Sequence, residues 1–100
     1  MSGYQVGFPS AAAEKSFERE LSRLDRPALQ RIKAAIDSLA ENPRPQGKKI
    51  KALRPPIHIS LFVAQYRIRV GDYRILYDID DRAGRVILLA IRRHSEKTYR

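Results

Sequence analysis

Three arginines lie on neighbouring segments whose pattern is typical of the two strands of a β-hairpin. Gly71-Asp72 suits a two-residue hairpin loop, and the runs on both sides of it are rich in Tyr, Ile and Val. This loop places Arg69 opposite Arg74, with Arg67 on the same face. Like charges directly opposite each other destabilise a sheet. The face therefore predicts an anion as its ligand, because a bound anion would relieve the repulsion.

A second group of polar residues follows near the C-terminus and comprises Arg92, Arg93, His94 and Tyr99. Arginine forks bind phosphate oxygens and stabilise the extra charge of a phosphoryl transition state. Tyrosine can stack on a base or handle a proton, and histidine titrates near neutral pH. RNA carries its own nucleophile, the 2′-hydroxyl, so cleavage would need no protein nucleophile and no metal. The residue types leave RNA binding and RNA cleavage equally open.

Other catalytic chemistries find little support in the sequence. There is no cysteine, the five glycines are scattered, and the two histidines, His58 and His94, are too few to predict a metal site. Asp78 and Asp80 share a strand face, but this spacing is equally typical of a strand end that faces solvent. We therefore expect no metal and no cofactor.

The positive charge is concentrated in the second half of the chain. Residues 1–47 carry 7 Lys/Arg and 6 Asp/Glu, whereas residues 48–100 carry 13 and 5, within an overall net charge of +9. Lys48, Lys49 and Lys51 add to this half just before the predicted hairpin. Such asymmetry favours a polyanion, with nucleic acid ahead of an acidic protein or a merely solvated basic surface.

The remaining elements must position these residues. Residues 4–8 alternate as a short strand, and Ser10 caps a helix over residues 11–24 whose apolar stripe contains Phe17. Asp25 caps a second helix that ends at Asn42-Pro43. Pro55-Pro56 is expected to break regular structure, and residues 57–64 either begin the first hairpin strand or form a separate piece.

The last predicted strand covers residues 85–91, whose nearly continuous apolar run favours a position covered on both faces. The order predicts one α+β domain over residues 1–100, with an N-terminal strand, a helical hairpin and then a three- to four-stranded, antiparallel-rich sheet. One hairpin face is expected to be core: Tyr66, Ile68, Val70, Tyr73, Ile75 and Tyr77. With no bilayer-spanning run and no secretory signal, we expect a cytoplasmic protein that has no membrane partner.

The hairpin at residues 66–79 and the C-terminal residues 92–100 resemble the RelE/ParE superfamily of bacterial toxins, and Lys48 to Leu53 also fits. The resemblance spans essentially the whole chain and favours the RelE-like branch. It implies a ribosome-dependent endoribonuclease that cuts mRNA in the ribosomal A site, through attack of a 2′-hydroxyl on the adjacent phosphate. Against this family, residues 55–65 look longer and more apolar than usual, and we expect an irregular loop there.

The resemblance also implies roles for particular residues. Arg74 would stabilise the transition state, Arg93 would act on the leaving group and phosphate, and Tyr99 would stack on or orient the base. Arg67 and Arg69 fall near lysine positions of the family, one of which is proposed as general base. Because arginine stays protonated, His94 or Tyr99 would transfer the proton instead. The expected RNA-binding residues are Arg67, Arg69, Lys48, Lys49, Lys51 and Arg92.

Partners follow from the same resemblance. They are a cognate antitoxin, often acidic, and mRNA on the ribosome with its rRNA, whereas operator DNA would be contacted only through the toxin–antitoxin complex. Two alternatives stay open at this point. One is a ParE-like inhibitor of DNA gyrase, and the other is a non-catalytic, basic nucleic-acid-binding module.

Overall fold

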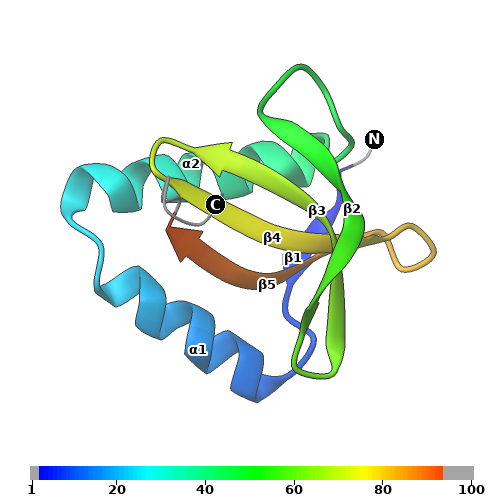
Figure 1. Cartoon of the computed structure of the whole chain (residues 1–100), viewed down its shortest axis with the longest axis horizontal. Coiled ribbons are helices and arrows are strands. Elements are labelled where there is room, and N and C mark those ends of the chain that lie inside the picture. The colour runs from blue at the N-terminus through cyan, green and yellow to red at the C-terminus, as the bar shows by residue number, and fades with distance from the viewer. Residues whose placement is uncertain (1–2, 94–100) are drawn as a thin grey trace.

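The computed structural model describes residues 3–93, which form two helices and a five-stranded sheet (Figure 1). In chain order the elements are β1 (Gln5–Gly7), α1 (Ala11–Ser22), α2 (Arg26–Glu41), β2 (Ile50–Ile59), β3 (Phe62–Val70), β4 (Tyr73–Asp80) and β5 (Arg85–Arg93). The sheet order is β1-β5-β4-β3-β2, with β1 parallel to β5 and every other pair antiparallel. This confirms the predicted α+β class.

Both helices begin at the predicted caps. The Ser10 hydroxyl accepts a hydrogen bond from the Ala13 N–H at 3.1 Å, and the Asp25 carboxylate accepts one from the Ala28 N–H at 2.9 Å. Each bond satisfies a backbone donor that the first helical turn leaves unpaired. Within the described residues, no helix is long and apolar enough to cross a membrane.

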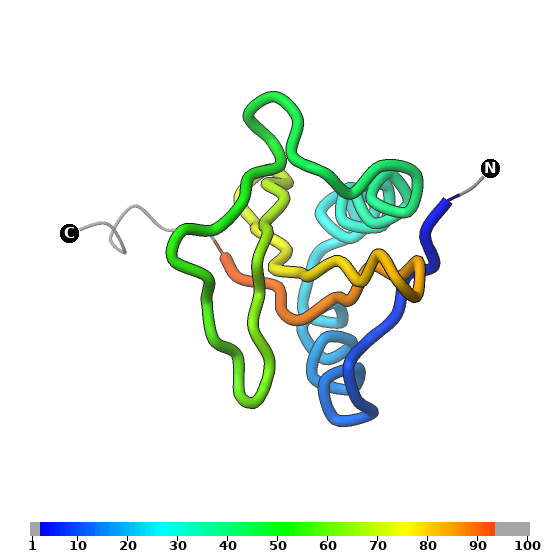
Figure 2. Tube along the Cα trace, turned by 90° about the vertical axis from the view of Figure 1, so that its right-hand side faces the viewer, coloured from blue at the N-terminus to red at the C-terminus, as the bar shows by residue number. Residues whose placement is uncertain are grey.

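The main core lies between the sheet and the two helices. Its central row runs across four strands, because Ile50 pairs with Ile68, Ile68 with Ile75, and Ile75 with Ile91. Phe17 of α1 and Ile32 and Leu39 of α2 are buried in this core, and Figure 2 shows the edge strand β2 on the left, away from both helices. The predicted core face of the hairpin is thereby confirmed: Ile68, Ile75 and Tyr77 are buried, and Tyr66, Val70 and Tyr73 are partly buried against them.

A second, smaller core covers the opposite side of the sheet and corrects two predictions. Pro55-Pro56 does not end regular structure, and residues 55–65 are not an irregular loop, since β2 continues to Ile59 and turns directly into β3. Pairing between β2 and β3 is interrupted only between Ala52 and Ile57. An edge strand tolerates proline because no neighbour needs its missing N–H. The β2–β3 hairpin is ordered because its apolar side chains pack against Ala64, Leu76 and Leu89 and help to bury them.

A β-bulge in β5 decides which way the end of the sheet faces. Leu76 pairs with Ala90 but Tyr77 pairs with Leu88, so Leu89 is an extra residue. Leu89 and Ala90 consequently both belong to the second core, and the alternation of side chains is shifted from there onward. The bulge therefore determines on which face of the sheet each later residue of β5 lies, including Arg92 and Arg93.

A polar cluster holds the other end of the molecule. Asp81, in the β4–β5 turn, accepts hydrogen bonds from the Tyr4 hydroxyl at 2.7 Å and from the Arg44 guanidinium, which also donates to the Tyr66 hydroxyl at 3.2 Å. The buried Tyr77 hydroxyl donates to the Pro43 carbonyl at 2.6 Å. These contacts fix the loop after α2, from which the lysine-rich start of β2 departs.

Candidate nucleic-acid interface

Three arginines from three adjacent strands form one row across the sheet. Arg69 on β3 pairs with Arg74 on β4, and Arg74 pairs with Arg92 on β5. Cross-strand partners project to the same face and stand about 5 Å apart. The predicted opposition of Arg69 and Arg74 is confirmed, and the structure extends it by a third cation. We call these three residues the arginine row.

Arg74, at the centre of the row, is half-buried, and its Nε has no hydrogen-bond partner among the described residues. A buried donor without a partner is costly, and two flanking cations add repulsion. Within residues 3–93 the ion pairs are Glu20–Arg23 and Arg44–Asp81, so no carboxylate of that region neutralises the row. An anion of the right shape would satisfy both the donor and the charge.

The lysine-rich segment lies beside the row. The Lys49 carbonyl accepts a hydrogen bond from the Arg67 guanidinium at 2.8 Å and another from the Arg69 N–H at 2.8 Å. Lys51 pairs with Arg67 across β2 and β3, and Lys48, Lys49 and Lys51 are all exposed. Arg67 therefore helps to position the start of β2, which brings the three lysines next to the arginine row.

Arg93 does not join the row. It pairs with Tyr73, whose ring is part of the helix side of the sheet, and its guanidinium carbon lies 5.9 Å from the centre of that ring. Arg74 and Arg93 are thus placed on opposite faces, and it is Arg92 that stands beside Arg74. The sequence could not show this, since a continuous apolar run hides the bulge at Leu89.

Two residues with predicted roles, His94 and Tyr99, lie outside the described residues. Between residues 3 and 93, no group of three or more His, Cys, Asp or Glu side chains could hold a metal ion. The side chains that the structure brings together are those of the arginine row, which can neutralise and orient a phosphate. No carboxylate of the described region forms an ion pair with the row.

The residues with shifted pKa values lie at the other end of the sheet. Hydrogen bonds from Tyr4 and then from Arg44 lower the pKa of the Asp81 carboxyl, while the bond to Asp81 raises the pKa of Tyr4. Burial raises the pKa of the Tyr77 hydroxyl. The Asp81 carboxylate therefore stays ionised at neutral pH while the Tyr4 and Tyr77 hydroxyls stay neutral, and the cluster fixes the loop after α2.

Residues 9–98 match the family described as the ParE toxin of type II toxin–antitoxin systems, parDE. The chain belongs to this toxin family. It is thus a toxin of a type II toxin–antitoxin system within the RelE/ParE superfamily, as the resemblance predicted. No curated protein matches the chain.

Solved structures of RelE toxins share the fold. The archaeal RelE–RelB complex from Pyrococcus horikoshii matches with a TM-score of 0.72 at 22% identity, covering 94% of this chain and 98% of that one. The RelBE2 toxin–antitoxin complex from Mycobacterium tuberculosis gives 0.63 at 25% identity, covering 92% and 99%. A mutant of the Escherichia coli toxin RelE in the free state gives 0.55 at 20% identity, covering 96% and 87%.

Proposed function

We propose that this toxin is an endoribonuclease that cuts mRNA in the ribosomal A site. The observation that carries the proposal is the arginine row, whose central guanidinium has a buried donor without a partner among the described residues. A scissile phosphate on this row would receive hydrogen bonds from Arg74 and charge from Arg69 and Arg92. The reaction would need no metal, because the substrate carries the nucleophile.

In this mechanism the 2′-hydroxyl of one nucleotide loses its proton and attacks the adjacent phosphorus. The 5′-oxygen of the next nucleotide leaves with a proton, and a 2′,3′-cyclic phosphate remains. The row stabilises the additional negative charge of the transition state. His94 or Tyr99 transfers the protons, since the arginines stay protonated. Tyr99 also orients the base.

The surroundings of the row support an RNA ligand of some length. Lys48, Lys49 and Lys51 are exposed beside β3, and they extend the positive surface along the β2–β3 edge. They would bind neighbouring phosphates of the mRNA or of ribosomal RNA. The proposed partners are therefore mRNA on the cytoplasmic ribosome and an antitoxin that neutralises the toxin. Operator DNA would be contacted through the toxin–antitoxin complex.

Mapping of mRNA 5′ ends after induced expression tests the proposal. We expect growth arrest and new 5′ ends within translated codons, and we expect these ends to disappear when translation is blocked. Arg74→Ala and Arg92→Ala should abolish both effects. Arg82→Ala is the matched control, because Arg82 is an exposed arginine of the β4–β5 turn, at the opposite end of these two strands from the row. Normal cleavage in both row variants would contradict the proposal.

The family match favours a second candidate, inhibition of DNA gyrase, because its description names ParE toxins. This function would need a protein-binding surface rather than a transition-state clamp. It predicts a DNA-damage response without new mRNA ends in the same expression experiment. A non-catalytic nucleic-acid-binding module predicts neither effect, and only salt-dependent RNA binding.

A further inference from the structure

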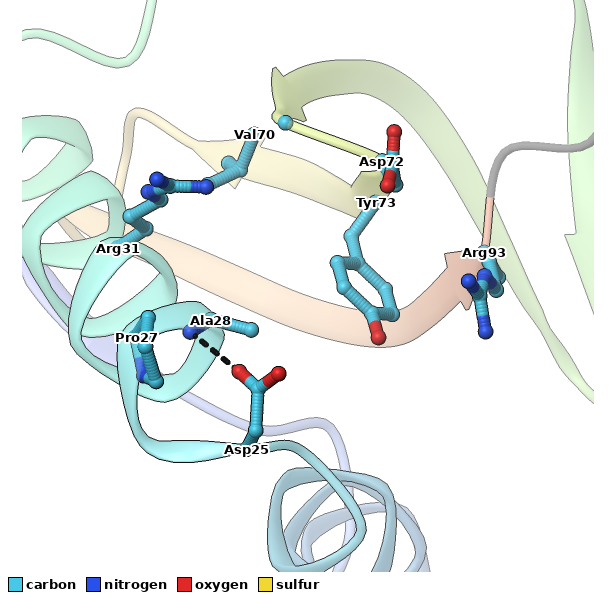
Figure 3. Close-up of a pocket in the computed structure, with 9 residues that line it drawn as sticks. Asp25, Pro27, Ala28, Arg31, Val70, Asp72, Tyr73 and Arg93 are labelled. Atoms are coloured by element: carbon cyan, nitrogen blue, oxygen red, sulfur yellow. Dashed lines mark hydrogen bonds between the residues drawn. The ribbon is translucent and has the colours of Figure 1, made fainter.

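A hollow of about 190 Å³ lies on the helix side of the sheet, away from the arginine row. It is bounded by the start of α2, the β3–β4 turn and the end of β5 (Figure 3). The side chains that matter for its chemistry are Asp25, Arg31, Asp72, Tyr73 and Arg93. The proposed mechanism gives no role to Asp25, Arg31, Asp72 or Tyr73, and Arg93 lies outside the arginine row.

An aromatic ring and a guanidinium stand together in this hollow. Figure 3 shows the Tyr73 side chain extending toward the start of α2, with Arg93 beyond it. The Arg93 guanidinium carbon is 5.9 Å from the ring centre, within the range of a cation–π contact. Aromatic rings and arginine planes are the surfaces on which proteins stack unpaired bases.

The opposite wall supplies another cation. Arg31, one turn into α2, extends toward the β3–β4 turn (Figure 3), and a Cβ at Gly71 would lie 3.7 Å from its Nη1. Neither Arg31 nor Arg93 has an ion-pair partner among residues 3–93. Two guanidiniums therefore border the hollow with donors available for phosphate oxygens.

The hollow also contains carboxylate oxygens. Asp25 caps α2 through one oxygen, which accepts from the Ala28 N–H at 2.9 Å, and no bond to its other oxygen occurs within the described residues. Asp72 lies across the hollow on the β3–β4 turn. Carboxylates accept hydrogen bonds from the amino and imino groups of bases. An acidic peptide would match the two cations but its side chains would offer no N–H donor to these carboxylates, and the charged lining disfavours an apolar segment.

We infer that this hollow binds one nucleotide of single-stranded RNA, with its base on Tyr73 and a phosphate held by Arg31 and Arg93. Asp25 favours guanine, whose Watson–Crick edge presents two adjacent donors, N1–H and N2–H, over adenine, whose N6 amino group stands beside the acceptor N1. That the ligand is RNA rests on the proposed function. Arg92 and Arg93 are consecutive and face opposite sides, so an RNA strand passing the end of β5 would contact the row and the hollow in succession.

Titration of the purified toxin with 5′-GMP, 5′-AMP and guanosine tests the inference, with NMR shifts of the Tyr73 ring and of α2 amides as the readout. We expect GMP to bind more tightly than AMP or guanosine. Arg31→Ala should weaken GMP binding about tenfold, because it removes charge-assisted hydrogen bonds to the phosphate. Asp25→Asn keeps the helix cap, since asparagine caps as well as aspartate, and should abolish the preference for GMP over AMP.

Matched controls are Arg26→Ala and Asp37→Asn, which remove exposed charges of α2 outside the hollow. Equal GMP affinity in Arg31→Ala and the native chain would overturn the inference. So would displacement of GMP by a hexaglutamate peptide at lower concentration than by a guanine-containing RNA trinucleotide. Because nucleotide binding is measured without cleavage, loss of mRNA cutting with intact GMP selectivity would refute the proposed function alone.

Discussion

Replacing Arg74 by methionine should make the protein more stable while abolishing the proposed mRNA cleavage. Arg74 stands between two like charges in the row, and its Nε is buried without a partner among the described residues. Each directly opposed like-charge pair costs about 0.2–1 kcal/mol, and an unsatisfied buried donor costs about 1–3 kcal/mol. Methionine keeps an unbranched stem beside the second core.

After allowance for side-chain contacts that methionine does not replace, we expect a net gain of about 1–2 kcal/mol in the free energy of unfolding. In a domain of this size that corresponds to a Tm rise of about 4–16 °C. Thermal and urea unfolding followed by circular dichroism would measure it. The gain should shrink in 1 M salt, where the screening length falls to about 3 Å.

Arg82→Met provides the control, because Arg82 is exposed in the β4–β5 turn and pairs with no other arginine across the sheet. We expect its stability to stay within about 0.5 kcal/mol of the native chain. A loss of stability in Arg74→Met at low salt, with Arg82→Met unchanged, would refute the view that the row is held together against its own repulsion.

Three further outcomes follow from the rest of the fold. Because the pKa of Asp81 is lowered in the native state, its ionised carboxylate stabilises the protein above the ordinary carboxyl pKa, and this contribution is lost as the pH falls through the folded-state pKa. Asp81→Asn should therefore make the free energy of unfolding, measured with urea, depend less on pH between about pH 5 and 2. Tyr77→Phe should cost about 1–3 kcal/mol in urea unfolding, because the Pro43 carbonyl loses its buried donor. Leu89→Ala should cost about 2–5 kcal/mol by the same measurement, and a cost below 1 kcal/mol would show that the second core contributes little.

The hairpin around Gly71 could be predicted because its signals are local. A Gly-Asp loop fixes the register between flanking strands, and strict alternation then assigns each side chain to a face. The observed pairing of Arg69 with Arg74 follows directly from that register. The helix caps at Ser10 and Asp25 could be predicted for the same reason, since capping depends only on a side chain and the backbone N–H three residues later.

Two features depended on long-range packing and could not be predicted. Pro55-Pro56 is tolerated in β2 because this strand is at the sheet edge, which the local sequence does not reveal. The bulge at Leu89 lies in an uninterrupted apolar run, in which every side chain could be buried on either face of the sheet, so the pattern does not reveal the extra residue. The sequence therefore could not separate Arg92, beside Arg74, from Arg93, on the helix side. Arg44 donates a hydrogen bond to Asp81, 37 residues later in the chain, and no sequence motif around Arg44 indicates this contact.

The most direct test is primer extension on purified ribosomes that carry a defined mRNA, after addition of the toxin. We predict a new 5′ end, carrying a hydroxyl, within the A-site codon, a 2′,3′-cyclic phosphate on the 3′ end of the upstream fragment, and no cleavage of the same mRNA without ribosomes. Arg74→Ala and Arg92→Ala should each slow cleavage by about 10²-fold or more, the typical cost of removing one preorganised donor. Intact mRNA after incubation with the native toxin, or equal cleavage by Arg74→Ala, would contradict a catalytic arginine row.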